Sequence, residues 1–212
     1  MGRFIENNDA QEGMICISAG AFLYGERKEK RELPEFWIAR APVTNAEYAQ
    51  FVIATEYEHP SHWEAGVPPD EILDHPVTQV SCYEAVAYAE WVGKRLPTEE
   101  EWEKAARGIE GWAYPWGEWE EGRCNMKEVG VGTTTPVGQY SPEGDSPYGC
   151  VDMAGNVFEW TASMDGKYQI LRGGAYNHGQ DLAHSTFRIR HKPSYRYRNI
   201  GFRLGSTMGG AK

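Results

Sequence analysis

Three segments in the first half of the chain combine an apolar face with a signal for the start of a helix. Thr44, Ser81 and Thr98 are each followed three residues later by Glu. In that arrangement the hydroxyl and the carboxylate can each satisfy a backbone amide of the first turn. Apolar side chains then recur at helical spacing, and the second and third segments run into Gly93 and Gly108. The pattern predicts three short amphipathic helices.

The positions around these helices follow a different pattern. Residues 14–25 alternate loosely between apolar and polar positions and end on Gly25, which indicates a strand followed by a turn. The charged run 26–35 predicts a solvated loop. After residue 108 no helical period persists, because glycine, proline and aromatic residues interrupt short alternating pieces. A helical first half and a loop-rich β second half, without repeats, predict one α+β domain over residues 1–212.

The composition agrees with a folded, loop-rich protein. Its 212 residues suffice for a self-supporting core, and 24 Gly and 12 Pro are many for a helical protein. The formal net charge of −10 disfavours non-specific attraction to nucleic acid or an anionic membrane. The chain contains no run of about 18 apolar residues, and no apolar signal core opens it. We therefore expect no nucleic-acid partner and no membrane insertion. The location stays open between the cytoplasm and display by another route.

Common catalytic and metal-binding motifs are absent from the sequence. No HExxH, GxSxG or phosphate-binding GxxxxGK[ST] occurs. The glutamates at the start of the third predicted helix, residues 99–103, are explained by the helix dipole, which favours negative charge at that end. The cysteines form no CxxC pair, so we expect free, buried thiols at Cys16, Cys82, Cys124 and Cys150.

Five motifs together resemble the formylglycine-generating enzyme (sulfatase-modifying factor) family. They are VSCYEAVAYAEWVGKRLPTEEEWEKAARG (80–108), YPWG (114–117), DMAGNVFEW (152–160), LRGG (171–174) and NIGFR (199–203). They occur in the family's order, and the resemblance extends over about residues 14–205. It implies a C-type-lectin-like fold with short helices and many loops.

The resemblance also implies that this chain lacks the family's catalytic site. The family's enzymes oxidise a substrate cysteine at a copper site, which two cysteines build shortly after the RGG motif. The matching positions here are His178 and Ala183, and no cysteine follows Cys150. Cu(I) requires thiolate or thioether ligands, so we expect no copper and no enzyme activity. The sulfoxide synthases of the ergothioneine pathway rely on a further helical domain with iron-binding histidines, which this sequence does not show. A divergent oxidoreductase with other metal ligands is the competing class.

Residues 172–205 resemble the variable region of proteins that retroelements diversify. In those proteins a C-terminal lectin-like cassette is rewritten at chosen codons, commonly Asn codons changed at their adenines. Mixed residues here fall between the framework residues Arg188, Pro193, Arg196, Gly201 and Phe202. Lys192 departs from the pattern, because adenine changes in an Asn codon do not produce Lys. The resemblance implies a variable protein that binds an unidentified protein ligand. An undiversified binding module of the same family is the alternative.

The candidate ligand-binding residues mix aromatic anchors with adaptable polar groups, as protein-binding surfaces do. We expect exposed contacts from Tyr176, His178, Tyr195 and Tyr197, whereas Phe187 and Ile189 alternate as in a strand, so at least one of them is expected in the core. The full candidate set is Tyr176, Asn177, His178, Asp181, Phe187, Ile189, Arg190, His191, Tyr195, Tyr197, Arg198 and Asn199.

Positive charge is concentrated in the same segment. Residues 172–203 carry six Arg and one Lys against Asp181 alone, an asymmetry that can steer an acidic partner toward this face. Part of the charge has a structural interpretation, because a planar guanidinium can clamp loop carbonyls and carboxylates. We expect that role for Arg172, Arg188, Arg196 and Arg203.

Calcium, bound at a structural site, is the one cofactor that the resemblance implies. The carboxylates of Asp152 and Glu159 and the carbonyls of Gly155 and Val157 match the family's calcium pattern, with Asp152 where the family usually has Asn. Such oxygen ligands suit Ca²⁺. The alternative is that the two carboxylates only bind loop amides. The sequence predicts no oligomeric state.

Overall fold

The computed structural model describes residues 13–207 and contains the three predicted helices. They are α1 (Asn45–Thr55), α2 (Cys82–Trp91) and α3 (Glu99–Arg107). Each helix begins with a complete capping box, in which the hydroxyl accepts from the amide of the Glu three residues on and that Glu accepts from the cap amide. These bonds satisfy amides that a helix start leaves unpaired. The predicted helix starts are confirmed.

Within residues 13–207, the strands form three sheets. The first has the order β1–β4–β9, from β1 (Met14–Ile17), β4 (Phe36–Ala39) and β9 (Gly205–Ser206). The second is the hairpin of β2 (Gly20–Tyr24) and β3 (Glu29–Leu33). The third has the order β7–β6–β5–β8, from β5 (Phe158–Asp165), β6 (Tyr168–Arg172), β7 (Arg188–His191) and β8 (Ile200–Phe202). Among these strands only the β5–β8 pair is parallel. The loops of the described chain also contain the short 3-10 helices η2 (Asp70–Ile72), η3 (Lys127–Val129) and η4 (Gln180–Ala183).

Two predictions near the start of the chain differ from the structure: residues 14–25 form two strands instead of one, and the charged run 26–35 is not a loop. Five of its residues form β3, which pairs with β2 in a regular antiparallel register. Most β3 side chains are exposed, and Arg31 pairs with Glu29 at 3.0 Å and Glu100 at 3.8 Å. An exposed edge strand tolerates such charges. The run therefore lacks the apolar alternation that identifies a half-buried strand.

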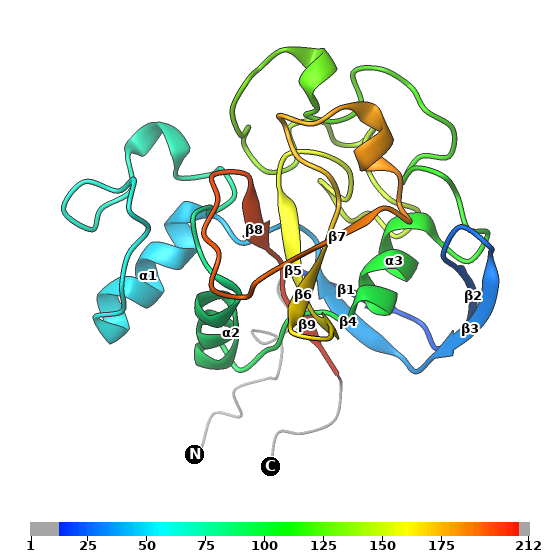
Figure 1. Ribbon diagram of the computed structural model, residues 1–212, viewed down its shortest axis with the longest axis horizontal. Coiled ribbons are helices and arrows are strands. Elements are labelled where there is room, and N and C mark those ends of the chain that lie inside the picture. The colour runs from blue at the N-terminus through cyan, green and yellow to red at the C-terminus, as the bar shows by residue number, and fades with distance from the viewer. Residues whose placement is uncertain (1–12, 208–212) are drawn as a thin grey trace, which may run out of the picture.

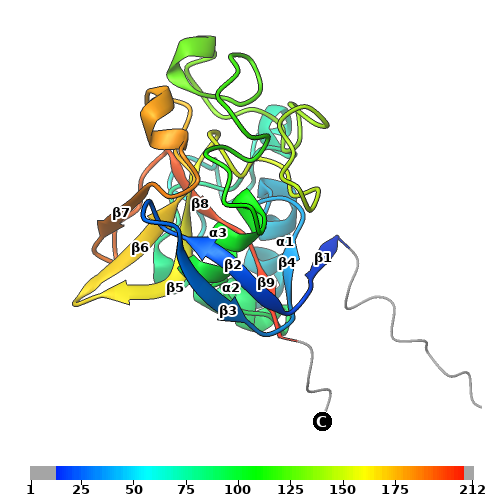
Figure 2. The same ribbon diagram turned by 90° about the vertical axis from the view of Figure 1, so that its right-hand side faces the viewer.

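The helices lie on both sides of the central strands. Figure 1 shows α1 and α2 on one side of the β5–β6 pair, with α3 and the β2–β3 hairpin on the other. On the first side Tyr48 of α1 stacks on Tyr88 of α2, with ring centroids 5.5 Å apart, and both pack against Phe202. On the other side Trp102 of α3 is fully buried in a second apolar cluster with Phe36. Figure 2 shows the β2–β3 hairpin in front of α3.

The cysteines are free, as predicted, in the described part of the chain. Cys16 is half-buried, and Cys82, Cys124 and Cys150 are buried. Burial raises the pKa of the Cys82 and Cys124 thiols to about 12. These thiols are packing residues, because a reactive cysteine needs a depressed pKa and exposure.

Candidate functional site

Arg203 anchors the end of the candidate variable segment in the protein core. Its Nε donates to Oε2 of Glu159 at 2.6 Å and its Nη2 donates to Oε1 at 2.7 Å, and neither side chain is exposed. Nη2 also donates to the carbonyl of Val151 at 2.9 Å, and the indole of Trp102 donates to the same Glu159 at 2.7 Å. A buried ion pair persists only where further hydrogen bonds complete it. This pair locks the chain after β8 against β5.

The same contacts bear on the predicted calcium ligands Asp152, Gly155, Val157 and Glu159. Both oxygens of Glu159 accept from the Arg203 cation. Asp152 accepts from the amide of Gly138 at 2.7 Å, and burial raises its pKa to about 6. From residue 13 to residue 207 there is no cluster of three or more His, Cys, Asp or Glu that could hold a metal ion. In this arrangement Asp152 binds a loop amide and Glu159 binds an arginine, and the calcium site stays an untested prediction.

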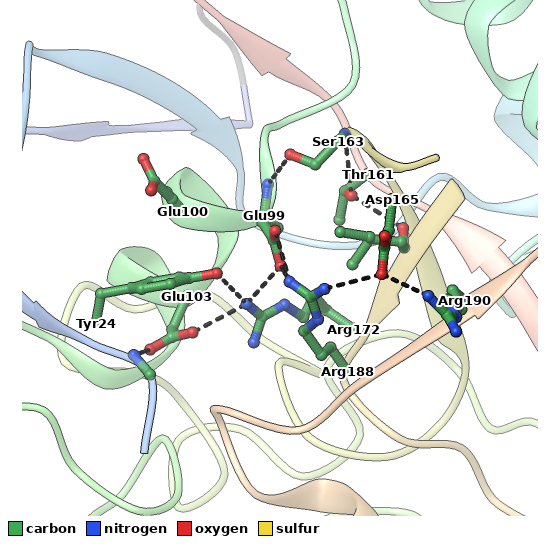
Figure 3. Close-up of polar contacts among 12 residues, drawn as sticks. Tyr24, Glu99, Glu100, Glu103, Thr161, Ser163, Asp165, Arg172, Arg188 and Arg190 are labelled. Carbon is green, nitrogen blue, oxygen red and sulfur yellow. Dashed lines mark hydrogen bonds and ion pairs between the residues drawn. The ribbon is translucent and has the colours of Figure 1, made fainter. Parts of the chain in front are cut away.

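A second ion-pair network fixes β6 and β7 against α3 (Figure 3). Nη2 of Arg172 lies 3.0 Å from Glu99 and 3.0 Å from Glu103, and Arg172 and Glu103 are almost wholly buried. Arg188 of β7 donates to the two oxygens of Glu99 at 2.9 and 3.0 Å. Both guanidinium groups point toward Glu99 in Figure 3. The helix dipole therefore explains only part of the role of these glutamates, because they also pair with arginines from the far end of the chain.

Arg196 forms the third clamp on the segment. Its Nε donates to Glu84 of α2 at 2.8 Å, and its Nη2 donates to Glu58 at 2.8 Å. Backbone bonds hold the same loop, because the carbonyl of Pro193 accepts from the amide of Cys82 at 2.9 Å. The structural role expected for Arg172, Arg188, Arg196 and Arg203 is thereby confirmed.

The candidate ligand-binding residues divide by exposure. Those that are exposed are Asn177, Asp181, Arg190, Tyr197 and Arg198. Those that are half-buried are His178, Phe187, Ile189, His191, Tyr195 and Asn199. Phe187 and Ile189 both pack against the main core, the apolar cluster that contains Tyr48, Tyr88 and Phe202, as expected for at least one of them.

The expectation of an exposed Tyr176 is wrong. Its side chain is only 5% exposed, and its amide donates to the carbonyl of Asn156 at 3.1 Å. The chain passes closely beneath its neighbours here: a Cβ at Gly174 would lie 2.7 Å from the carbonyl oxygen of Leu182. The backbone after the RGG motif therefore turns into the protein and takes Tyr176 with it.

Three aromatic rings gather at one end of the candidate surface. His191, Tyr195 and Tyr197 have ring centroids 5.4 to 5.6 Å apart. Tyr195 also packs against the main core, whereas Tyr197 is 44% exposed. The carbonyl of Tyr197 accepts from the amide of Gln79 at 3.0 Å, which fixes the backbone beneath its ring. The cluster is therefore held at Tyr195 by the core and exposes the ring of Tyr197 to a partner.

His178 and Ala183 are the two positions that the sequence matches to the family's catalytic cysteines. The ring of His178 packs edge-on against Phe158, with centroids 5.2 Å apart, and burial lowers its pKa. The side-chain amide of Asn199 donates to the side-chain oxygen of Asn177 at 3.1 Å. Ala183 is fully buried beside apolar side chains. His178 therefore offers an imidazole and Ala183 only a methyl group, and neither can supply a thiolate.

A pocket of about 640 Å³ lies beyond the predicted site residues, with only Asp181 and Phe187 in common with them. Its other walls include Trp112, Tyr114 and Glu118. None of these three residues is among the binding residues predicted from the sequence. Pocket walls from separate loops carry no signal in the sequence, because only the folded chain brings them together.

Comparison with known proteins places the chain in a family. The profile of the sulfatase-modifying factor enzyme 1-like domain matches residues 3–207. The chain belongs to this family. Within the described residues, no helix has both the length and the apolar character needed to cross a membrane.

Relatives in this family include proteins named as inactive and as active enzymes. The chain is 40% identical over 163 residues to the inactive C-alpha-formylglycine-generating enzyme 2 of Bos taurus, a match of 66% of this chain and 52% of that protein. The Mus musculus protein of the same name is 32% identical over 278 residues, with 100% and 85% covered. Hercynine oxygenase of Mycolicibacterium smegmatis is 31% identical over 232 residues, with 82% and 53% covered. The chain thus spans about half the length of the bovine and mycobacterial proteins.

The fold is shared with solved structures of low sequence identity. Treponema denticola variable protein 1 superimposes with a TM-score of 0.75 at 22% identity, covering 91% of this chain and 94% of that one. The C-type-lectin-like α+β fold of the formylglycine-generating enzyme type, predicted from the motifs, is confirmed.

Proposed function

We propose that this chain is a non-catalytic binding protein that contacts a protein ligand through the exposed side chains of residues 177–199. One observation carries the proposal: buried ion pairs of Arg172 and Arg203 anchor the chain on both sides of this segment, while aromatic and polar side chains project from it. A support that stays rigid while its surface side chains change is the arrangement that binding loops use.

Two findings support a non-catalytic role. His178 and Ala183 provide no thiolate for a copper ion, and no cysteine follows Cys150. Relatives in two mammals carry the name of an inactive formylglycine-generating enzyme. The competing reading is a divergent oxidoreductase, which the similarity to hercynine oxygenase favours. Stoichiometric copper or iron in the purified protein, or turnover of a thiol substrate, would support the oxidoreductase.

We further propose that the segment is diversified, as in retroelement variable proteins. The fold shared with Treponema denticola variable protein 1 supports this at the level of the scaffold. The framework residues Gly201 and Phe202 are buried, and the mixed positions Tyr197 and Arg198 are exposed. A reverse transcriptase gene and a near-copy of the 3′ coding segment that differs mainly at adenines are expected nearby. Without them, the undiversified binding module stands.

A protein ligand fits the chemistry of this surface. Tyr197 supplies a large ring with little side-chain entropy to lose, and such rings dominate protein-binding sites. Lys192 and Arg198 are exposed, and neither forms an ion pair with any residue between 13 and 207. Their free charges favour an acidic patch on the partner and a faster encounter with it.

Crosslinking from this surface tests the proposal. A photoreactive phenylalanine analogue replaces Tyr197 in one variant and Tyr83 in the matched control, because Tyr83 is an exposed tyrosine of α2 outside the segment. We expect one host protein to crosslink from position 197 and not from position 83. The pair Tyr197→Ala and Arg198→Ala should then abolish binding of that purified protein. An identical set of crosslinks from both positions would contradict the proposed surface.

A further inference from the structure

The pocket of about 640 Å³ lies next to the proposed binding surface and has its own character. Four segments line it: the turn of the β2–β3 hairpin, the chain that follows α3, the aromatic loop 112–118 and the chain around η4. Figure 1 shows the hairpin, α3 and η4 on the same side of the molecule. Its volume falls within the range of about 300 to 1,000 Å³ that small-molecule sites occupy.

Negative charge surrounds this pocket. Its lining includes the exposed carboxylates of Glu26, Glu110, Glu118 and Asp181. None of these four forms an ion pair with another residue of the described chain. Asp181 and Glu118 lie close enough to Tyr114 in the pocket wall to act on it electrostatically. Burial is the main cause of the raised pKa of Tyr114, and the charges of these two carboxylates raise it further. The four carboxylates are available to a cation from outside.

The cations in the lining leave this charge largely unopposed. Arg107 lies at the base of the pocket with its side chain 2% exposed, and it pairs with Glu103 at 2.9 Å. Its remaining N–H groups donate to the carbonyls of Gly25, Gly111 and Trp112 at 2.8 to 3.0 Å. A guanidinium with these partners has little capacity left for an external anion. Lys28 alone opposes the four carboxylates from the rim.

Aromatic rings provide the second requirement for binding a cation. Trp112, Tyr114 and Phe187 line the pocket, and Trp112 is 41% exposed. Tyr114 is held in place by Trp119, with ring centroids 5.0 Å apart, and by the edge of His184 at 5.5 Å. The faces of such rings attract ammonium and guanidinium groups, and Trp does so most strongly.

We propose that this pocket binds an organic cation, an ammonium or guanidinium group on an apolar stem. The carboxylates attract the charge and the rings of Trp112 and Tyr114 contact the stem and the cation. The same chemistry is offered by a Lys or Arg side chain of a polypeptide and by a free diamine or guanidine. The inference does not rest on the proposed function, because three of the four carboxylates and two of the three rings lie outside residues 172–205.

Calorimetric titration of the purified chain tests this site. The first probe is an acetylated and amidated Gly-Arg-Gly-Lys-Gly peptide, the second is agmatine, and the reference is a Gly-Glu-Gly-Glu-Gly peptide. We expect the cationic probes to bind more tightly than the acidic one. Binding of the peptide alone identifies a polypeptide source, and binding of agmatine alone identifies a free small cation.

Two variants and a matched control separate the pocket from the overall charge. The pair Glu118→Gln and Asp181→Asn should weaken the cationic probe about tenfold, because each partly exposed ion pair adds a modest share of the binding free energy. Trp112→Ala should weaken it as well, because it removes the exposed ring. The control pair Glu71→Gln and Glu90→Gln changes the net charge equally at exposed positions outside the pocket.

The result that would overturn the inference is equally specific. Cationic probes that bind no more tightly than the acidic peptide would refute the site. Equal weakening by the control pair would show that only the net charge of the protein attracts the probe. Thermal unfolding of each variant verifies folding, and all the altered side chains are exposed, so intact folding is expected.

Discussion

Removal of Arg203 should destabilise the protein more than most single substitutions. Arg203→Met keeps an apolar stem of similar length but removes the guanidinium that faces both oxygens of Glu159. Because neither side chain is exposed, water cannot replace the lost partner without opening the core. The carboxylate would then stay buried beside a single donor, the indole of Trp102.

The expected loss follows from the burial of this pair. Breaking a fully buried ion pair by removing one partner costs about 3 to 5 kcal/mol. That is a large part of the total of about 5 to 15 kcal/mol that stabilises a typical domain. Adding Glu159→Gln should restore part of it, because the neutral amide needs no counter-charge and its oxygen still accepts from Trp102.

Urea unfolding followed by tryptophan fluorescence measures both effects. We expect the transition midpoint of Arg203→Met to fall well below that of the parent, and the double variant to lie between them. A single variant within about 1 kcal/mol of the parent would refute the reasoning, since that is the typical cost of an average point mutation. A double variant no more stable than the single one would contradict the role of the unpaired charge. Millimolar calcium, added in parallel, tests the predicted metal site, since a bound ion stabilises the folded parent.

Three further predictions concern other parts of the chain. Gly201→Ala should lower stability by about 1 to 3 kcal/mol in the same urea assay, because its Cβ would lie 2.6 Å from a carbonyl oxygen, whereas Gly179→Ala should change little because it meets only a flexible carboxylate. Burial raises the pKa of Asp152 from 3.8 to about 6, so stability in a chelator should fall by up to about 3 kcal/mol as the pH rises from about 4 to about 6. Asp152→Asn should flatten that pH profile; an unchanged profile would show that this carboxyl is not its source. Native protein should react at Cys16 alone with a thiol reagent counted by mass spectrometry, and early labelling of a second site would contradict the burial of Cys82, Cys124 and Cys150.

The sequence predicted the features whose signals are local. Each capping box lies within four residues, so Thr44, Ser81 and Thr98 could be identified without knowledge of the fold. The role of the framework arginines was predicted too, but their partners were not. Arg172 meets Glu99 across 73 positions of chain, and no local pattern records such a pairing.

The errors have the same origin. Strand β3 consists mostly of charged residues, so its sequence lacks the apolar alternation that identifies a strand. The apolar side chains of the hairpin come from its partner, β2. Tyrosine is a residue type common in protein contacts, but the backbone at Gly174 lies close to that of Leu182, and Tyr176 is buried in the interior. The pocket is lined by four segments that lie far apart in the sequence. The sequence therefore contains its residues but does not indicate that they meet.

The inward direction of the arginine clamps has an evolutionary consequence. Exchanges at exposed positions such as Tyr197 and Arg198 leave Arg172, Arg203 and their glutamates untouched. Each exchange should then change stability by about 0.5 kcal/mol or less. Many alternative surfaces are therefore accessible by successive mutation without passing through an unfolded ancestor.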